Sequence, residues 1–237
     1  MKPIKLIASL SAYKLVGLWM RFGGSAAIDA GSVYSLSIDA RNAGAEARLT
    51  KAKGGREQKT WATWDDADSV LPLIDLNRLP LNMWGLCLNS EDELANLLGG
   101  IHFRYPCRVG WLPSTRFYSR NNRGTAMHQS YLAIYENLTI EKTIKRFLKG
   151  KLPLLLTTSF NPGGLPPARD LETALDYAEK LGVMFVVYDP SISSDVRKGS
   201  FPAISMTEDG VLEVVRKSGD ISIVLNELRN AGYAVRL

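Results

Sequence analysis

Hydrophobic and polar positions follow a clear helical period in the second half of the chain. The apolar positions of residues 171–181 recur three and four residues apart, which predicts an amphipathic helix. Asp170 is suited to cap the start of this helix, and Gly182 is suited to end it. Near-continuous apolar runs at residues 152–156 and 183–189 predict a buried strand on either side. Together the three elements predict a βαβ unit with parallel strands and a right-handed crossover.

Shorter patterns predict further strands and helices around this unit. Strands are expected at four other places, the first of them half-buried: residues 33–39, 101–109, 211–216 and 233–237. Helices are expected at residues 89–100, 139–149 and 220–230, the first two capped by Ser90 and Thr139. This alternation of strands and helices predicts an α/β fold with a mixed sheet.

Four places are expected to depart from this regular pattern. Residues 1–20 are expected to form a core strand or helix, because Lys14 interrupts the apolar run that a secretory signal needs. Residues 49–59 (LTKAKGGREQK) suggest a solvated basic loop, and residues 61–68 (WATWDDAD) a short amphipathic turn with a solvated acidic end. Pro106 cannot donate to a strand ladder, so it predicts an edge or a bend in its strand.

Length and composition are those of an ordinary globular protein. The chain has 237 residues, of which 46% are hydrophobic, enough for a sizeable core. We expect residues 81–237 to form an α/β domain and residues 1–80 an N-terminal segment, either part of that domain or separate from it. Two cysteines are too few for a disulfide scaffold, which indicates a reducing, cytoplasmic setting. No run of about 18 apolar residues is free of charge, so we expect neither a membrane span nor a membrane partner.

Charge and histidine content limit the classes of ligand. The net charge of +5 favours an anionic partner, and nucleotides, phosphorylated metabolites and nucleic acids all fit. The only histidines are His102 and His128, which excludes a metal site built on several imidazoles. We therefore expect no metal site. Aromatic side chains among arginines in residues 116–123 (RFYSRNNR) support a nucleic-acid-binding module as one hypothesis.

A hydroxyl-rich stretch follows the predicted strand at residues 152–156. It contains Thr157, Thr158, Ser159 and Asn161, and then Pro162, Gly163 and Gly164. In open α/β sheets, ligands bind beyond the carboxyl ends of strands, where short hydroxyl and amide groups suit a polar or anionic group. The paired glycines would allow the backbone to approach a ligand closely. Alternatively, Ser159 and Asn161 only close a turn.

A second candidate site lies in the predicted strand at residues 101–109. His102, Arg104 and Arg108 occupy even positions there, whereas the odd positions are apolar or aromatic. Since successive side chains of a strand point to opposite faces, one face would pack and the other would present three basic groups. The planar fork of arginine pairs with phosphate through two hydrogen bonds, so this face suits a phosphorylated ligand.

Three segments in sequence order resemble the C-terminal domain of the carbamoyltransferases that include nodulation and antibiotic O-carbamoyltransferases. Residues 152–187 are similar to that family's apolar strand, its Asn-Thr-Ser-Phe-Asn motif and the helix that follows. Residues 122–130 (NRGTAMHQS) resemble its Asp-Gly-Thr-Ala-Arg-x-Gln segment. Residues 102–108 (HFRYPCR) resemble its Lys-x-Arg-Glu-x-Phe-Arg segment. The resemblance covers residues 84–190.

The resemblance implies a YrdC-like fold, with a mixed twisted sheet and flanking helices. It implies that the chain makes carbamoyl-adenylate from ATP and a carbamoyl group derived from carbamoyl phosphate, with magnesium accompanying the ATP. It implies that the adenylate is bound by Thr125, Thr158, Ser159, Asn161 and Gly164, and that phosphate and carbamoyl oxygens are bound by the catalytic His102, Arg104 and Arg108. We expect both sets to line one hollow.

Four positions depart from the family's pattern. His102 stands where the family has lysine, Met127 where it has arginine, Thr157 where it has asparagine, and Leu165 where it has an acidic residue. The loss of two cations at a phosphate site leads to an alternative hypothesis. In it the chain is a non-catalytic subunit that stabilises or regulates an active carbamoyltransferase. Three arginines either compensate for the loss or form a solvated basic loop: Arg116, Arg120 and Arg123.

The family's transfer domain has no counterpart in this sequence. That domain is actin-like and carries a metal held by histidines, and the residues before position 84 are too few to form it. If the chain takes part in carbamoyl transfer, the acceptor site must therefore lie on another polypeptide. We expect a hetero-oligomer with a larger, actin-like carbamoyltransferase subunit.

Overall fold

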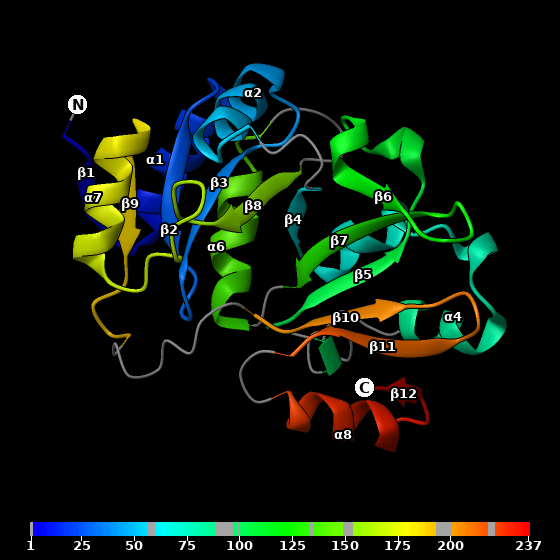
Figure 1. Cartoon of the computed structure of the whole chain (residues 1–237). Coiled ribbons are helices and arrows are strands. Elements are labelled where there is room, and N and C mark those ends of the chain that lie inside the picture. Colours follow the sequence, from blue (N-terminus) through cyan, green and yellow to red (C-terminus); the bar gives the residue numbers. More distant parts are fainter. Residues whose placement is uncertain are drawn as a thin grey trace. The chain divides into compact units, whose positions relative to one another are not determined.

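The chain folds into two compact units, each built from two separate stretches of sequence. The computed structural model describes residues 2–55, 60–88, 97–98, 100–132, 135–148, 154–192, 201–217 and 221–237. Unit 1 comprises Met1–Lys59 and Thr139–Ser200, and unit 2 comprises Thr60–Leu138 and Phe201–Leu237. Both contain strands and helices (Figure 1), so the fold class is α/β with a mixed sheet, as predicted. The expected boundary near residue 80 stays a prediction, and Pro80 itself lies inside unit 2.

In its described residues, unit 1 contains strands of a mixed sheet and four helices. Its strands, in spatial order, are β1 (Ile4–Ile7), β9 (Phe185–Tyr188), β2 (Ser25–Asp29), β3 (Tyr34–Asp39) and β8 (Leu155–Ser159). Its helices are α1 (Leu10–Arg21), α2 (Ala43–Ala52), α6 (Tyr135–Lys145, which enters this unit at Thr139) and α7 (Leu171–Leu181). β9 is parallel to β1 and β2, whereas β3 is antiparallel to β2 and β8. β8 and β9 therefore run in the same direction, as predicted, although β2 and β3 lie between them.

Helix α7 is confirmed with both of its predicted caps. The Asp170 carboxylate accepts a hydrogen bond from the Thr173 backbone N–H at 2.7 Å, and Gly182 ends the helix at φ 68°. Ala174 and Ala178 of the predicted apolar stripe are fully buried. The helix was predictable because its caps and its period are local properties of the sequence.

Three predictions for unit 1 need correction. β8 begins at Leu155 rather than 152 and runs to Ser159, so the first part of the hydroxyl-rich stretch belongs to the strand. Thr157 pairs there with Ser37 and Ser159 with Ser35, so the polar residues are matched across β3. Helix α6 begins at Tyr135, and Thr139 is therefore not its N-cap. β3 is confirmed but is buried along its whole length rather than half-buried, because α1 and α2 both pack against it.

Unit 2 contains the remaining strands, which also pair both parallel and antiparallel, and has short helices in its connections. Six strands follow one another in the order β4 (Ala62–Asp65), β7 (Ala126–Leu132), β5 (His102–Pro106), β10 (Ala203–Met206), β11 (Val211–Arg216) and β12 (Ala234–Arg236). β6 (Tyr118–Arg120) pairs with β7. The helices are α3 (Ala67–Val70), η1 (Leu71–Leu73), η2 (Leu76–Arg78), α4 (Leu81–Leu88), η3 (Val109–Trp111), η4 (Thr115–Phe117) and α8 (Ser222–Asn230).

Most predicted elements of unit 2 are present. β5, β11, α8 and β12 confirm the strands and the helix expected in those places. β5 is not an edge strand, because β7 and β10 flank it. Pro106 is tolerated there because β10 pairs only with His102–Arg104, so the missing N–H falls beyond that ladder. The helix expected at residues 89–100 lies almost entirely outside the described residues.

The expectation for residues 61–68 is wrong. Residues 62–65 form β4, a buried strand parallel to β7, and the side chain of Asp65 is completely buried rather than solvated. Its carboxylate accepts hydrogen bonds from Thr63 and from Ser130 (2.7 Å), and the Thr63 hydroxyl also contacts His128 Nε2 at 2.8 Å. The hydroxyl groups of Thr63, on the same strand, and of Ser130, on β7, thus replace water around the carboxylate, which is what permits its burial.

None of the helices in the described part of the chain combines the length and the apolar character that crossing a membrane requires.

Candidate functional site

The end of β8 is joined to a lysine from a distant part of the sequence. Lys53 follows helix α2, and its ammonium group donates hydrogen bonds to the backbone oxygen of Ser159 and to Asn161 Oδ1, the latter at 2.7 Å. The Ser159 hydroxyl donates to the same Asn161 oxygen at 2.9 Å. We call these three residues the Lys53 cluster. It places a cation directly on the motif that the sequence predicts to bind a nucleotide.

Asn161 uses its full hydrogen-bonding capacity inside the loop. Its Oδ1 accepts from Lys53 and Ser159, and its Nδ2 donates to the backbone oxygens of Leu165 (2.6 Å) and Pro162 (3.1 Å). A primary amide has these two functions and no others. Asn161 therefore closes the loop, as in the turn-closing alternative, and at the same time positions Lys53. Any contact of Asn161 with a ligand requires one of these bonds to be exchanged.

Two neighbouring glycines in this loop have different structural roles. A Cβ atom on Gly163 would lie 2.9 Å from the backbone oxygen of Lys53, so only glycine allows the loop to approach Lys53 so closely. The chain's own backbone, rather than a ligand, makes the close approach at Gly163. Gly164 has φ +88° and no atom within 4 Å of where its Cβ would lie, so it is needed for its backbone conformation. Contact of Gly164 with a ligand stays a prediction.

Thr158 is adjacent to the Lys53 cluster but not part of it. It lies in β8, paired with Leu36, and it precedes Ser159 directly. Since successive residues of a strand alternate between faces, the side chains of Thr158 and Ser159 point to opposite faces of the sheet.

Lys53 lies in the stretch that the sequence predicts to be a solvated basic loop, and no sequence motif singles it out. The structure corrects this: only 8% of Lys53 is exposed, and α2 continues to Ala52. A local indication was present, because Ala45, Leu49 and Lys53 are each four residues apart and so share one helical face. Ala45 and Leu49 are both buried on that face.

In unit 2, the three residues of the predicted basic face, His102, Arg104 and Arg108, do not share one environment. His102 and Arg104 lie in β5, whereas Arg108 lies beyond the strand, is exposed, and precedes η3. Of these three, only Arg104 lines a pocket of about 370 Å³. Thr125 is buried, and its hydroxyl donates to the carboxylate of Glu208. The structure thus separates these four candidate residues more than the sequence pattern suggested.

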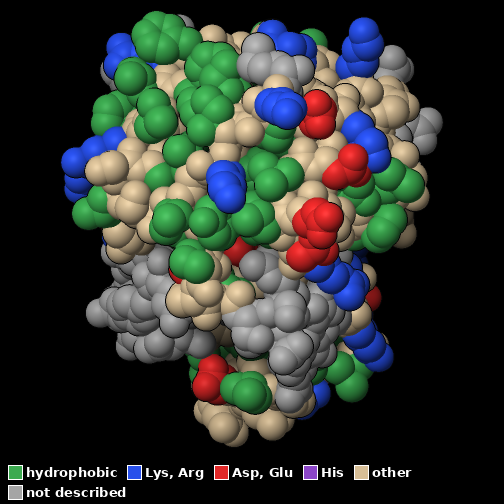
Figure 2. Space-filling view, turned by 90° about the vertical axis from the view of Figure 1, so that its left-hand side faces the viewer, with side chains coloured by type: hydrophobic (Ala, Val, Ile, Leu, Met, Phe, Trp, Pro, Cys, Tyr) green, Lys and Arg blue, Asp and Glu red, His purple; other side chains and the backbone are tan. Residues whose placement is uncertain are grey.

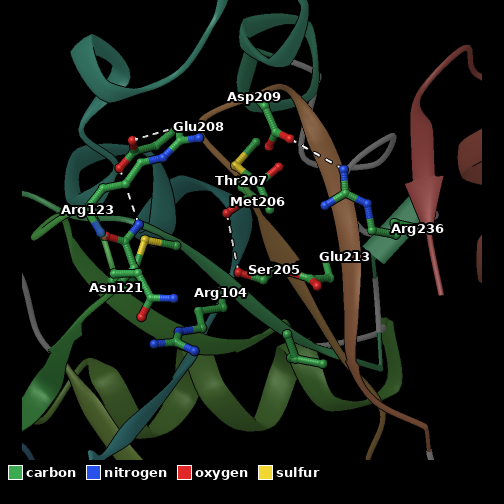
Figure 3. A pocket seen from close by; sticks show the side chains of 13 residues that line it. Arg104, Asn121, Arg123, Ser205, Met206, Thr207, Glu208, Asp209, Glu213 and Arg236 are labelled. Carbon is green, nitrogen blue, oxygen red and sulfur yellow. Dashed lines mark hydrogen bonds and ion pairs between the residues drawn. The ribbon is translucent and has the colours of Figure 1, made fainter.

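The pocket, which we call the arginine pocket, lies on one face of the unit 2 sheet. Arg104, Ser205, Glu213 and Arg236 are successive cross-strand partners on β5, β10, β11 and β12, so they share that face. Figure 3 shows Arg104, Ser205 and Glu213 following one another along the pocket. Arg104 donates a hydrogen bond to the Ser119 hydroxyl, and burial lowers the pKa of its guanidinium.

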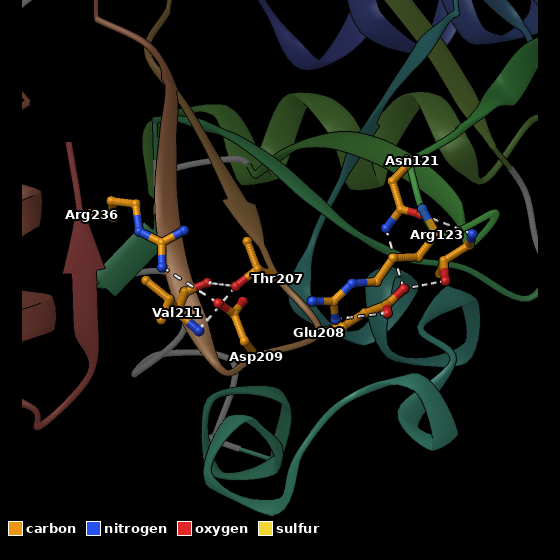
Figure 4. Close-up of polar contacts among 8 residues, drawn as sticks. Asn121, Arg123, Thr207, Glu208, Asp209, Val211 and Arg236 are labelled. Carbon is orange, nitrogen blue, oxygen red and sulfur yellow. Dashed lines mark hydrogen bonds and ion pairs between the residues drawn. The ribbon is translucent and has the colours of Figure 1, made fainter.

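Carboxylates offset much of the positive charge in the arginine pocket. Arg123 pairs with Glu208 at 3.3 Å, and Arg236 pairs with Asp209 at 3.4 Å (Figure 4). The hydrogen bond from Thr125, with further bonds from Asn121 and Arg123, lowers the pKa of Glu208. The sequence analysis missed these acidic residues, because β10 and β11 bring them beside β5 from a distant part of the chain.

His102 cannot supply the charge that a lysine would. Its ring packs beside those of Tyr131 and Phe201, with centroid distances of 5.5 and 6.3 Å, and its Nδ1 accepts a hydrogen bond from Gln129 at 3.1 Å. Burial, with the nearby charge of Arg216, lowers the pKa of His102 to about 3. The imidazole is therefore neutral at physiological pH, so it can interact with a phosphate only through a hydrogen bond.

The three further arginines all have partners within unit 2. The guanidinium of Arg116 lies over the Trp61 ring at 5.3 Å, and that of Arg120 lies over the Tyr118 ring at 5.9 Å. Arg123 is paired with Glu208. Met127, at the family's arginine position, is buried and lines the arginine pocket. These arginines thus stabilise the loop that carries them, and their compensation for the missing cations stays a prediction.

The two sets of candidate residues belong to different units. Ser159, Asn161 and Lys53 lie in unit 1, whereas Arg104 and Arg108 lie in unit 2. The expectation that both sets line one hollow stays a prediction.

Comparison with known proteins identifies the fold. No protein-family model matches the chain, and no curated protein matches it. A structure of P. abyssi Sua5 aligns with a TM-score of 0.71 and 14% identity, over 98% of this chain and 66% of that one. E. coli YciO aligns with a TM-score of 0.68 and 16% identity, over 92% of this chain and 98% of that one. Full-length HypF in its phosphate- and nucleotide-bound form aligns with a TM-score of 0.60 and 18% identity, over 87% of this chain and 29% of that one.

These likenesses show that the fold is YrdC-like, as the resemblance implied. The chain spans 66% of the Sua5 structure and 29% of HypF, so the activities of those whole proteins are not transferred with the fold. The narrower assignment to the nodulation-type carbamoyltransferases stays a prediction.

Proposed function

We propose that this chain binds a nucleotide at the Lys53 cluster and forms carbamoyl-adenylate from ATP and a carbamoyl group derived from carbamoyl phosphate. The observation that carries the proposal is the ammonium group of Lys53, fixed on Ser159 and Asn161 at the end of β8. Ligands of α/β sheets bind beyond the carboxyl ends of strands, and a positioned ammonium group is suited to phosphate oxygens.

One structural neighbour supports the nucleotide part of the proposal. Full-length HypF, of which this chain covers 29%, was solved with phosphate and nucleotide bound. Another structure of P. abyssi Sua5 is a complex with a different small ligand, L-threonine.

The proposed reaction needs charge neutralisation more than acid–base chemistry. Hydrolysis of carbamoyl phosphate supplies carbamate and releases inorganic phosphate. A carbamate oxygen then attacks the α-phosphorus of ATP, and the new P–O bond forms as the bond to pyrophosphate breaks. Lys53 would bind phosphate oxygens and neutralise part of their charge, and Arg104 and Arg108 would bind phosphate and carbamoyl oxygens. His102 would contribute a neutral hydrogen bond at most. Magnesium would arrive with the phosphates of ATP.

The carbamoyl group would then pass to an acceptor on a second polypeptide, a larger actin-like carbamoyltransferase subunit. We place the reaction in the cytoplasm, in line with the two cysteines, Cys87 and Cys107, which are both buried free thiols.

Pyrophosphate exchange into ATP, dependent on carbamoyl phosphate, tests the proposal. We expect exchange by the wild-type chain, alone or with its partner, and its loss in Lys53→Met. The matched control is Lys51→Met, because Lys51 is exposed at the end of the same helix. Absence of both nucleotide binding and exchange, with and without the partner, would refute the proposal.

Two observations favour a second candidate, a non-catalytic subunit that stabilises or regulates an active carbamoyltransferase. His102 is neutral, and the arginine pocket contains carboxylates beside its arginines. In this case the activity of the complex should survive Ser159→Ala combined with Arg108→Ala. Loss of activity in that double variant, with the complex still assembled, would exclude the second candidate.

A further inference from the structure

Most charged side chains of the arginine pocket are paired with each other. Arg123 pairs with Glu208, and Arg236 pairs with Asp209. Each pair joins one positive and one negative charge, so neither pair adds net charge to the pocket. Met127 adds none either, although the family that the chain resembles has arginine at this position. A ligand of the pocket therefore meets mainly the charges that remain.

Arg104 and Glu213 are the charged side chains of the pocket that remain outside these pairs. The guanidinium of Arg104 donates a hydrogen bond to the uncharged hydroxyl of Ser119, and it has further N–H groups to donate, because a guanidinium carries five. The carboxylate of Glu213 makes no hydrogen bond or ion pair with any described residue. In the described part of the chain, one cation and one anion of the same pocket thus have no partner of opposite charge.

The pairing of the strands holds Arg104 and Glu213 apart. Arg104 lies opposite Ser205 across β5 and β10, and Ser205 lies opposite Glu213 across β10 and β11. Because neighbouring strands are roughly 5 Å apart, the Cα atoms of Arg104 and Glu213 are separated by roughly 10 Å. Figure 3 shows Ser205 between the two charged side chains, on the same face of the sheet. The pocket therefore presents a cation on one side of Ser205 and an anion on the other.

Partial burial distinguishes these two charges from those of an open surface. On the face shown in Figure 2, Lys, Arg, Asp and Glu side chains lie scattered over the surface, where water solvates them. Arg104 and Glu213 are half-buried in a pocket of about 370 Å³, a volume typical of small-molecule sites. Burial also lowers the pKa of the Arg104 guanidinium, which has lost part of its water. Both groups therefore favour a ligand that supplies the opposite charge.

We propose that the arginine pocket binds a small dipolar molecule, with an anionic group on Arg104, an ammonium group on Glu213 and a short hydrocarbon chain between them. Apolar side chains that also line the pocket offer contact to that chain: Met127, Met206 and Val215. The separation across two strands favours charges several bonds apart over an α-amino acid, whose two charges share one carbon atom. The pocket lies within unit 2, so the inference does not depend on the proposed nucleotide site at Lys53.

Two isomers test the separation of the charges. δ-Aminovalerate and norvaline contain the same atoms, but only δ-aminovalerate carries its two charges at opposite ends. Valerate and pentylamine each keep one of the two charges. By isothermal titration calorimetry we expect δ-aminovalerate to bind about tenfold more tightly than each of the other three, because it alone can contact both Arg104 and Glu213.

The variant Glu213→Gln tests which group holds the ammonium. We expect it to bind δ-aminovalerate about tenfold more weakly than the wild type and to bind valerate equally well, since only the ammonium contact is lost. The variant Arg104→Gln should weaken the binding of both compounds. Glu227→Gln is the matched control, because Glu227 is an exposed carboxylate of unit 2 outside the pocket; its affinities should match those of the wild type. Circular dichroism confirms that each variant is folded.

Three results would overturn the proposal. The first is a folded wild-type chain that does not bind δ-aminovalerate at tens of millimolar, and the second is equal affinity for the two isomers. The third is an affinity for δ-aminovalerate that stays unchanged in Glu213→Gln. These titrations contain no nucleotide, so their failure is distinguishable from a failure of pyrophosphate exchange.

Discussion

The Lys53 cluster of unit 1 and the arginine pocket of unit 2 hold their cations in different ways. Lys53 donates hydrogen bonds to a backbone carbonyl and a side-chain amide at the end of β8. Arg123 and Arg236 are paired with carboxylates, which offset part of their charge. Cationic side chains alone therefore do not define a phosphate site, because the groups around them decide how much charge a ligand encounters. The Lys53 cluster differs from the arginine pocket in that its cation is held directly on the motif that the resemblance assigns to the nucleotide.

The largest change in stability should come from a substitution that disturbs the packing of the Gly163 loop on Lys53. In Gly163→Ala, the new methyl group would lie 2.9 Å from the Lys53 backbone oxygen, so the backbone must move. We expect a loss of about 2–3 kcal/mol in the free energy of unfolding, measured by chemical denaturation. Gly44→Ala is the control, because its methyl group would make only ordinary contacts within α2. An unchanged stability of Gly163→Ala would show that the close packing is not required.

A smaller change should appear in the pH dependence of stability when His102 is replaced. This substitution tests whether the imidazole ring of His102 is held neutral. Its pKa of about 3 in the folded protein lies below the unfolded value of about 6.5. Between these values the unfolded chain binds more protons, so stability falls as the pH falls. From pH 7 to pH 4.5 we expect the wild-type chain to lose about 1–2 kcal/mol more than His102→Gln does. His128 is present in both proteins, so its own titration cancels. Equal losses would mean that His102 is not held neutral.

The smallest change in stability should come from replacing Glu208, whose carboxylate lies in the arginine pocket. The folded-state pKa of Glu208 is lowered, so its stabilising contribution is present above its unfolded pKa and is lost as the pH falls through the folded value. Glu208→Gln should cost less than about 1 kcal/mol at pH 7, because its ion pair with Arg123 is at the surface, and the cost should shrink as the pH falls through the folded-state pKa. Glu213→Gln is the control, since the carboxylate of Glu213 makes no hydrogen bond or ion pair with the described residues. A Glu208 variant that matches this control at every pH would contradict the assigned role.

Sequence patterns predicted what depends on neighbours along the chain. The caps and period of α7, the strands around it and the YrdC-like fold all follow from short stretches or from motifs in order. The hydroxyl-rich stretch was correctly placed at the end of a strand, although the strand itself extends further into it. Local hydrogen bonding and side-chain alternation are sufficient for such predictions.

Contacts between distant stretches could not be predicted in this way. Lys53 meets Ser159 only because α2 and β8 belong to the same unit, and the buried Asp65 carboxylate accepts a hydrogen bond from Ser130 only because β7 lies beside β4. Glu213 and Arg104 line the same pocket only because β5, β10 and β11 pair with one another. The side chains of Lys53 and Asp65 were expected in water because their partners lie far away in the sequence, and nothing in the sequence pointed to Glu213.

The most direct test of the central claim is the affinity of the Lys53 cluster for ATP, measured by isothermal titration calorimetry on the wild-type chain, Lys53→Met and Lys51→Met. If the fixed ammonium of Lys53 binds phosphate, Lys53→Met should weaken binding by roughly a hundredfold, while Lys51→Met should stay within about twofold of the wild type. Equal affinities in all three proteins, each shown to be folded, would contradict the claim that this cluster is the nucleotide site.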